Sequence, residues 1–209
     1  MISAASAAGI AIVALGMVLT PGPNMMYLVS RSLSQGWRAG MISLLGTVAG
    51  FLVYLTLANL GLAEVFRTAR WLYWAVRLAG AAYLLHLAWQ ALRPHGTAIF
   101  DVRDLPPDPA PRLFRMGLLT NLLNPKAAIM YLALIPQFID PARGHVLAQG
   151  FLLGATQISV SAAVNAAIVL AASAIATFSA TRPGWLRGQR LVTGALLAAF
   201  ALRLALGGG

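Results

Sequence analysis

Cysteine is absent from the 209-residue sequence, and acidic residues number only five. The absence of cysteine excludes disulfides, thiolate metal sites and thiol redox chemistry. The acids, all in segments that we expect to be loops, are Glu64, Asp101, Asp104, Asp108 and Asp140. The apolar part of the chain therefore lacks the usual ligands of a heavy-metal site and the paired acids of a catalytic site. We expect neither a metal nor a cofactor.

Charge of either sign is scarce, because charged residues make up 10% of the sequence and hydrophobic residues 59%. A typical soluble domain has about 25% charged residues. Apolar runs of the roughly 20 residues that a helix needs to cross a bilayer recur along the whole chain. The sequence therefore predicts an all-α integral membrane protein that crosses the bilayer several times.

Apolar runs predict about six transmembrane helices. They span residues 4–30, 40–62, 71–92, 116–138, 147–178 and 191–206, and the last is short enough that full crossing stays open. Residues 94–111 hold five of the eleven prolines and three acids, which is typical of a solvated linker. We expect a single domain over residues 1–209, with halves at 1–93 and 113–209 joined by a cytoplasmic linker at 94–112.

The net charge of +10 comes mainly from arginines in short segments between the apolar runs. This distribution argues against nucleic acid as a partner, which would need one continuous basic face. It indicates topology instead, because cytoplasmic loops are enriched in Lys and Arg. The arginine-rich segments lie at 31–38, 93–115 and 182–190. We expect these in the cytoplasm, with the loops of Arg67 and Arg143 outside and both termini periplasmic.

An internal repeat appears when the chain is shifted by 104 residues against itself. The shift pairs Pro21 with Pro125, Met26-Tyr27-Leu28 with Met130-Tyr131-Leu132, and Gly40, Gly46 and Gly50 with Gly144, Gly150 and Gly154. Coincidence among abundant residues is the alternative explanation, although Met, Tyr and Pro are not abundant. Because each half would hold three helices, an odd number, the second copy would be inverted, giving a 3+3 inverted repeat.

Proline motifs break the first and fourth runs, at Thr20-Pro21-Gly22-Pro23-Asn24 and at Asn124-Pro125. Proline lacks an N–H group and clashes with the preceding turn, which frees the carbonyls of Met17, Leu19 and Asn121. An opened backbone at membrane depth is tolerated where it lines a cavity. Thr20 and Asn124 each resemble an N-cap followed by proline at the first helical position.

The two half-helices that follow these breaks are predicted to start near mid-membrane. A helix N-terminus presents unpaired N–H groups and about half a positive charge, which suits a carboxylate. Inverted symmetry would direct both ends at one binding site. The alternative is that the prolines only kink two helices and shape their packing.

Lys126 is the only lysine in a chain with fourteen arginines, and it directly follows the second break. Ionisable residues at membrane depth are costly and usually face a cavity or a partner. A buried lysine can also lose its proton, so Lys126 is a candidate for a carboxylate clamp and for proton coupling. The alternative is a side chain that extends to the membrane interface.

Polar residues of the fifth run give further candidates, since Ser161 and Asn165 share a helix face at a spacing of four. They either bind a ligand or only join helices by hydrogen bonds. The candidate binding residues are Thr20, Pro21, Gly22, Pro23, Asn24, Asn121, Asn124, Pro125, Lys126, Gln157, Ser161 and Asn165.

His86 in the third run is a second candidate for proton coupling, because histidine titrates near neutrality. A hydrogen-bonded histidine within the bundle is the alternative. Two glycine pairs, Gly46 with Gly50 and Gly150 with Gly154, have the spacing that lets helices approach closely. We expect them to pack helices, and the glycine-rich faces also make a homodimer a weaker expectation.

The combination of Thr20-Pro21-Gly22-Pro23-Asn24, Asn124-Pro125-Lys126-Ala127 and Pro136-Gln137-Phe138, with the glycines of the second run, resembles the LysE/RhtB family of bacterial amino-acid exporters. The resemblance covers nearly the whole chain. It implies a location in the bacterial inner membrane, efflux of amino acids or close derivatives driven by the proton gradient, and the two proline motifs in the transport core.

Phe51 stands where family members that export basic amino acids often carry an acid. With no acid expected in the membrane, a zwitterionic substrate with a neutral side chain, such as homoserine, threonine or leucine, is favoured over lysine or arginine. A passive channel or an exporter of another solute stays open. An intramembrane enzyme is disfavoured, because Ser159, Ser161 and His86 form no recognised catalytic motif.

Overall fold

The computed structural model describes residues 2–62 and 107–181, with scattered helical positions between 71 and 89 and between 191 and 206. Its α-helices are α1 (Ala4–Leu19), α2 (Pro23–Gln35), α3 (Trp37–Leu57), α6 (Ala110–Leu122), α7 (Pro125–Ile129) and α8 (Val146–Thr181). Shorter helical turns are η1 (Ala58–Leu62), η2 (Met130–Leu134), η3 (Ile135–Phe138) and η4 (Pro141–Arg143). Every element of this described part is helical, which confirms the all-α prediction.

Several helical segments are long and apolar enough to cross a membrane. The segments Trp37–Leu60 and Val146–Ala172 are long and hydrophobic enough to cross a bilayer, and α1 with α2 and α6 with α7–η3 form two bent pairs that pass the same test. Up to four of the expected spans therefore lie in the described part. The expected spans at 71–92 and 191–206, and most of the linker at 94–112, fall outside it.

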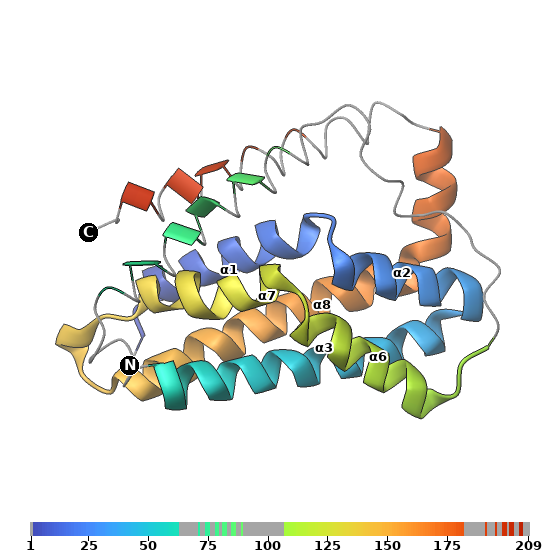
Figure 1. The fold of residues 1–209 in the computed structure, drawn as a ribbon. Helices are drawn as coiled ribbons and strands as arrows, with labels where there is room; N and C mark the ends of the chain where they lie inside the picture. The colour runs from blue at the N-terminus through green and yellow to red at the C-terminus, as the bar shows by residue number, and fades with distance from the viewer. Residues whose placement is uncertain are drawn as a thin grey trace.

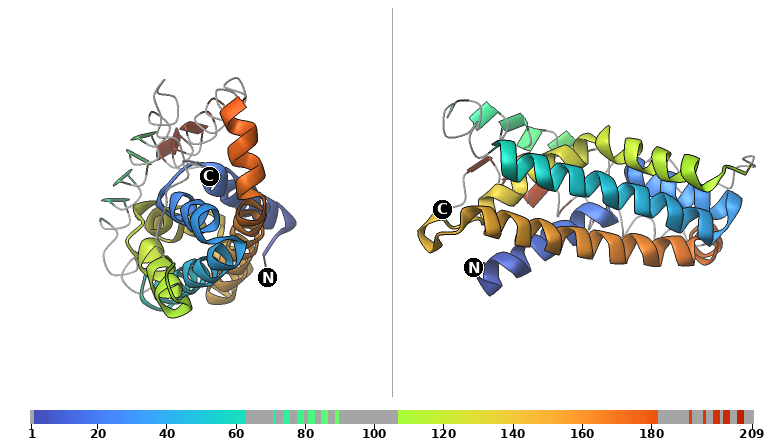
Figure 2. Two further views of the ribbon diagram at one scale, coloured as in Figure 1. Left: turned by 90° about the vertical axis from the view of Figure 1, so that its right-hand side faces the viewer. Right: turned by 90° about the horizontal axis from the view of Figure 1, so that it is seen from below.

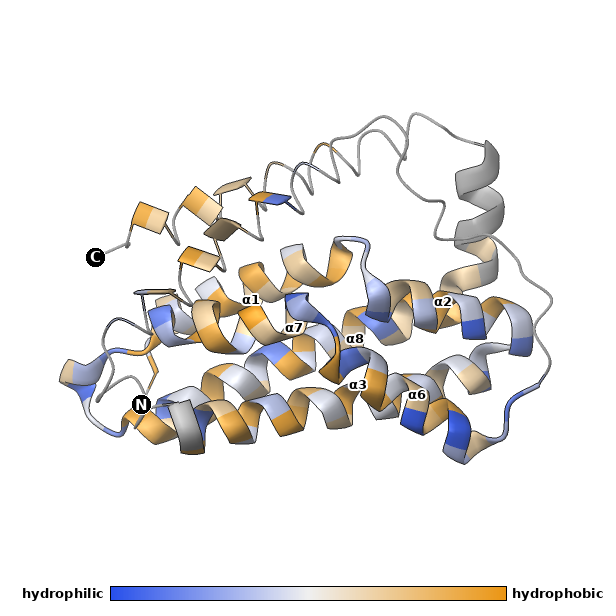
Figure 3. Cartoon of the chain, viewed as in Figure 1, coloured by the Kyte–Doolittle hydropathy of each residue, from blue (hydrophilic) through white to orange (hydrophobic). Residues whose placement is uncertain are grey.

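The helices form an elongated bundle in which α3 is central. It packs against α6, α2 and α8, while α1 packs against α8, and Figure 2 shows these helices running alongside one another. Large apolar side chains such as Leu45 (60% exposed) and Leu170 (60% exposed) point outward. An apolar outer surface fits lipid as the surrounding solvent, and Figure 3 shows hydrophilic residues mainly at the helix ends and near the start of α7.

Glycine brings α3 and α6 into backbone contact. A Cβ atom added to Gly46 would overlap the Phe114 carbonyl oxygen, and one added to Gly117 would overlap the Ser43 carbonyl oxygen. On α8, Gly150 lies against Asn59 and Gly154 against Leu55. The residues of both glycine pairs thus sit at helix contacts in this structure.

A buried ion pair fastens α2 to the start of α6. The Asp108 carboxylate, 7% exposed, accepts a hydrogen bond from Arg31 and forms an ion pair with Arg112 (3.1 Å). The Asp108 N–H also donates to the Gln35 side chain (2.8 Å). Asp108 is in a loop, as expected, but its carboxylate is enclosed by this contact.

Candidate functional site

A cavity of about 40 Å³ lies where the α1–α2 break meets α7 and α8. Its polar lining residues are Asn24, Asn124, Lys126, Gln157, Ser161 and Asn165. Its apolar lining residues are Met17, Val18, Met25, Phe51, Ala127 and Met130. Six of the residues proposed from the sequence are therefore brought together around one space.

Lys126 extends from α7 to the end of α1. Its Nζ donates to the backbone oxygens of Met17 (2.9 Å) and Thr20 (2.8 Å). The carbonyl of Met17 was expected to be freed by the break, and Lys126 is the group that pairs it. The side chain does not extend to an interface, so it holds the opened backbone at the cavity wall.

Gly22 leaves the space that Lys126 occupies. A Cβ atom added at Gly22 would lie 3.0 Å from Nζ, which is closer than nearly all real contacts of that kind. The absence of a side chain at this position therefore lets the ammonium approach the break.

The first break differs from the expectation. Thr20 does not cap α2, because its hydroxyl (2.7 Å) and its N–H (3.2 Å) both donate back to the Gly16 carbonyl and end α1. The N-cap of α2 is Gly22, and Pro23, not Pro21, is its first residue. Glycine has no side-chain acceptor, so α2 begins without a side-chain cap.

The second break follows the expectation more closely. Asn124 is the N-cap of α7, its side chain accepts a hydrogen bond from the Lys126 N–H (3.0 Å), and Pro125 is the first helical residue. The carbonyls before this break are not left open. The Asn121 carbonyl accepts from the Asn124 N–H (3.0 Å), and the Leu122 carbonyl accepts from the Tyr54 hydroxyl (2.8 Å).

The two half-helix N-termini are thus unequal. The α7 end is capped by its own asparagine, whereas the N–H groups of Asn24 and Met25 at the α2 end form no hydrogen bond within the described part of the chain. Both residues line the cavity. Unpaired N–H groups at a helix start attract anions, so the α2 end and Lys126 together form the electropositive side of the cavity.

A hydrogen-bonded ladder on α8 forms the opposite side. Gln157 accepts from the Tyr131 hydroxyl (2.5 Å) and donates to the Ser161 hydroxyl oxygen (2.8 Å). Asn165 donates to the Ser161 carbonyl (2.8 Å). Tyr131 is buried and stacks on Tyr54 with ring centroids 5.8 Å apart. Of these bonds only Tyr131–Gln157 joins two helical elements, because the other two lie within α8. Gln157, Ser161 and Asn165 all line the cavity.

In the described part of the chain, two asparagines carry buried side-chain atoms without hydrogen-bond partners. In Asn24 the unpaired atom is Oδ1, and in Asn121 both Oδ1 and Nδ2 are unpaired. Asn24 lines the cavity, but Asn121 is enclosed against Gly50 of α3. Of these two asparagines, only Asn24 is therefore part of the cavity wall.

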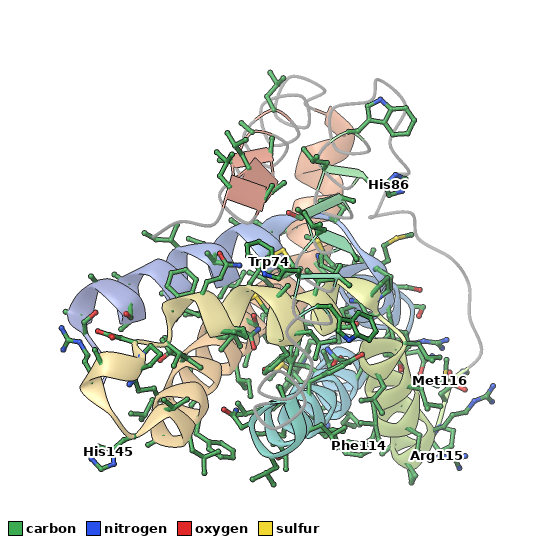
Figure 4. All side chains as sticks on the ribbon, turned by 60° about the vertical axis from the view of Figure 1, so that its left-hand side comes forward. Trp74, His86, Phe114, Arg115, Met116 and His145 are labelled. Carbon is green, nitrogen blue, oxygen red and sulfur yellow. The ribbon has the colours of Figure 1, made fainter. Side chains whose placement is uncertain are left out.

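Several predicted residues do not line the cavity. They are Thr20, Pro21, Gly22, Pro23, Asn121, Pro125 and His86. Three of these still shape it, because Thr20 accepts from Lys126, Gly22 gives it room and Pro23 starts α2. His86 is exposed, with its ring centroid 6.1 Å from that of Trp89. Figure 4 shows His86 and His145 at opposite corners of the molecule.

The apolar wall was mostly missed by sequence reasoning. Phe51 was singled out only by the family pattern, and it does line the cavity. Met17 and Met25 flank the first proline motif at short range, which is a signal that a search around the break would have used. Among the described residues, no cluster of three His, Cys, Asp or Glu residues can hold a metal ion.

Residues 15–208 match the family model described as LysE type translocator. The leucine efflux protein of Salmonella typhimurium is 29% identical over 192 residues, which cover 92% of this chain and 91% of that protein. The homoserine/homoserine lactone efflux protein of the same organism is 31% identical over 173 residues, 82% of this chain and 79% of that protein. The leucine efflux protein of Klebsiella pneumoniae is 29% identical over 189 residues, 90% and 89%. No solved structure matches the chain.

Proposed function

Because this chain belongs to the family of LysE-type translocators, as its sequence motifs indicated, we propose that it exports small neutral amino acids or their close derivatives from the cytoplasm. Membership makes it a multi-pass membrane transporter of a bacterial exporter family and not an enzyme. The observation that carries the substrate class is the cavity, where Lys126 faces the uncapped start of α2. Such a pairing suits a carboxylate.

A neutral side chain is favoured by what lines the cavity. Within the part of the chain that the structure describes, no acidic residue lines the cavity, and Phe51 occupies part of the apolar wall. A second ammonium or a guanidinium on the substrate would be buried there without a counter-charge, which is costly. The relatives named for leucine and homoserine efflux support the same substrate class.

Lys126 is also our candidate for proton coupling. An ammonium has three N–H donors, and two of them bind Met17 and Thr20. The neutral amine has two N–H groups, so it would keep both of those bonds. Loss of the third proton would remove the positive charge that faces the substrate and leave the contact with α1 in place. His86 is the weaker candidate, because it does not line the cavity.

The cavity must widen to accept such a substrate. A cavity of about 150 Å³ is the size known to admit benzene, and this cavity is about 40 Å³. Transport therefore needs a movement of the surrounding helices. The two bent pairs, with angles of 57° and 56°, support our proposal of an inverted repeat, with halves 1–93 and 113–209 and a cytoplasmic linker at 94–112.

The direct test is a panel of labelled amino acids loaded into proteoliposomes that contain the purified protein. We expect accelerated efflux of neutral amino acids such as L-leucine and L-homoserine, with little efflux of L-lysine. An imposed proton gradient should drive efflux against a concentration gradient, and counterflow should distinguish a carrier from a channel. Efflux of no amino acid above empty liposomes, with the protein correctly folded, would contradict the proposal.

A further inference from the structure

Asn24 presents an unusual group to the cavity. The residue is 8% exposed and lines the cavity, and its Oδ1 atom has no hydrogen-bond partner among the described residues. A buried acceptor without a partner costs free energy, typically about 1 to 3 kcal/mol. Such an atom in a binding cavity is an acceptor that the protein itself leaves unsatisfied.

The position of Asn24 relates this acceptor to the electropositive side of the cavity. Asn24 is the second residue of α2, and its own N–H is one of the unpaired donors at that helix start. In an α-amino acid the ammonium and the carboxylate are attached to the same carbon, so their binding groups must lie within a few ångströms of each other. One residue that offers a backbone donor and a side-chain acceptor meets this requirement.

Other acceptors on the facing helix are less available. The Gln157 Oε1 atom already accepts from Tyr131, and the Ser161 hydroxyl oxygen already accepts from Gln157. Among the described residues, none that lines the cavity carries a carboxylate that could bind an ammonium instead. Asn165 uses only its Nδ2 atom, for the Ser161 carbonyl, but it lies on α8 and not at the start of α2. Asn24 is therefore the acceptor at the α2 end that a cationic group can satisfy without breaking an existing side-chain bond within the described residues.

We propose that Asn24 Oδ1 accepts a hydrogen bond from the α-ammonium group of the substrate, while Lys126 and the N–H groups of Asn24 and Met25 bind its carboxylate. The inference rests on the proposed export of amino acids and adds the orientation of the substrate. It makes Asn24 a specificity-determining residue: the site selects molecules with a free ammonium beside a carboxylate. The side chain then lies towards the apolar wall that contains Phe51.

The test removes groups from the protein and from the ligand in turn. Three ligands are compared by the shift in melting temperature of the purified protein in detergent: L-leucine, 4-methylpentanoate, which lacks the amino group, and 3-methylbutylamine, which lacks the carboxyl group. We expect Asn24→Ala to lower the affinity for L-leucine about tenfold or more. The affinity for 4-methylpentanoate, which is weaker from the start, should not change. The ligand-free melting temperature should not fall, because the lost oxygen has no partner.

Asn24→Ser gives the same comparison if Asn24→Ala does not fold. Thr156→Ala is the matched control, because Thr156 is half-buried on α8 and lies outside the cavity lining, and it should respond to all three ligands as the wild type does. If Asn24→Ala lowers the affinity for 4-methylpentanoate as much as the affinity for L-leucine, or changes neither affinity, the inference is wrong. If the wild type binds and transports no amino acid at all, the proposed function fails first.

Discussion

Lys126 has two roles in this structure, and they have different experimental signatures. Its ammonium pairs two backbone oxygens at the end of α1, and the same atom lies at the wall of the cavity. Removing it leaves the oxygens of Met17 and Thr20 unpaired, so a loss of transport alone does not identify a substrate contact. Stability without ligand and affinity for ligand have to be measured separately.

Lys126→Met is expected to abolish most transport and to lower the melting temperature. A charge-assisted hydrogen bond to a carboxylate contributes about 1.5 to 3 kcal/mol, so affinity for the exported amino acid should fall roughly ten- to a hundredfold. Lys126→Arg should also bind poorly, because a planar guanidinium does not replace a compact ammonium beside Gly22. The control is Arg143→Gln at an exposed cation. If Lys126→Met binds and transports the amino acid with wild-type affinity and rate, Lys126 has only a structural role.

At single positions, the sequence identified the residues at the helix breaks better than it predicted their hydrogen-bond partners. Asn124 was identifiable as a cap because an asparagine before proline is a local signal. Thr20 before Pro21 has the same local signal, but its hydroxyl bonds Gly16 and the helix starts at the second proline. The start at Pro23 and not at Pro21 accompanies contacts across the break that a local signal does not contain, such as the bond of Lys126 to Thr20, which is 106 residues away in sequence.

Among the helices, the contact between α3 and α6 depends on glycine on both sides. Gly46→Ala and Gly117→Ala each place a methyl group against backbone of the other helix, which cannot rotate away as a side chain would. We expect each change to cost about 1 to 3 kcal/mol, as overpacking typically does, and to lower the melting temperature in detergent. Leu45→Ala on the outer face of α3 is the control. Unchanged melting temperatures for both glycine variants would show that the helices separate easily here.

The ion pair between α2 and α6 gives a second expectation for the helices. Asp108→Ala leaves the Arg31 guanidinium, 12% exposed, without its carboxylate. Removing one partner of a buried ion pair typically lowers stability by roughly 3 to 5 kcal/mol. The double variant with Arg31→Ala should be less destabilised than the sum of the single changes, and Arg112→Ala, at a 66% exposed side chain, should have little effect. If the losses of stability in this double-mutant cycle are additive, Asp108 and Arg31 are not energetically coupled and the expectation is wrong.

Helix type after the second break could not be predicted from sequence. Residues Met130–Leu134 form a π-helical turn and Ile135–Phe138 a 3₁₀ turn, where an uninterrupted run to residue 138 was expected. Apolar periodicity does not distinguish these forms in a segment of five residues. The π-helical turn contains Tyr131, whose hydroxyl binds Gln157, so tertiary contacts of this residue accompany the local geometry.

For the whole molecule, the sidedness in the membrane stays a prediction from the distribution of arginines. The α2–α3 turn and the start of α6 lie at one end of the bundle, and the η4 loop lies at the other with the beginning of α1 (Figure 1). Arginine counting places the first end in the cytoplasm. Single cysteines at Pro107 and Ala142, in this cysteine-free chain, should therefore react with an impermeant maleimide from the inside and the outside, respectively. Labelling of position 107 from outside intact cells would reverse the topology.

A homodimer remains a proposal of the same scale, based on glycine-rich helix faces. Native mass spectrometry in several mild detergents should detect a dimer mass. A monomer in all of them would remove the dimer without affecting the cavity, which is lined by residues of one chain.

The central claim is that an exported amino acid occupies the cavity between Lys126, Asn24 and α8. Substrate protection of a single cysteine tests it most directly. Ser161→Cys places a thiol of nearly the same size on the cavity wall, and Thr156→Cys, five residues earlier on the same helix and outside the cavity lining, is the control. We expect the transported amino acid to slow alkylation at position 161 in proteoliposomes, half-maximally near its transport affinity, and to leave position 156 unaffected. Equal alkylation of position 161 with and without saturating substrate, in a variant that still transports, would contradict the account.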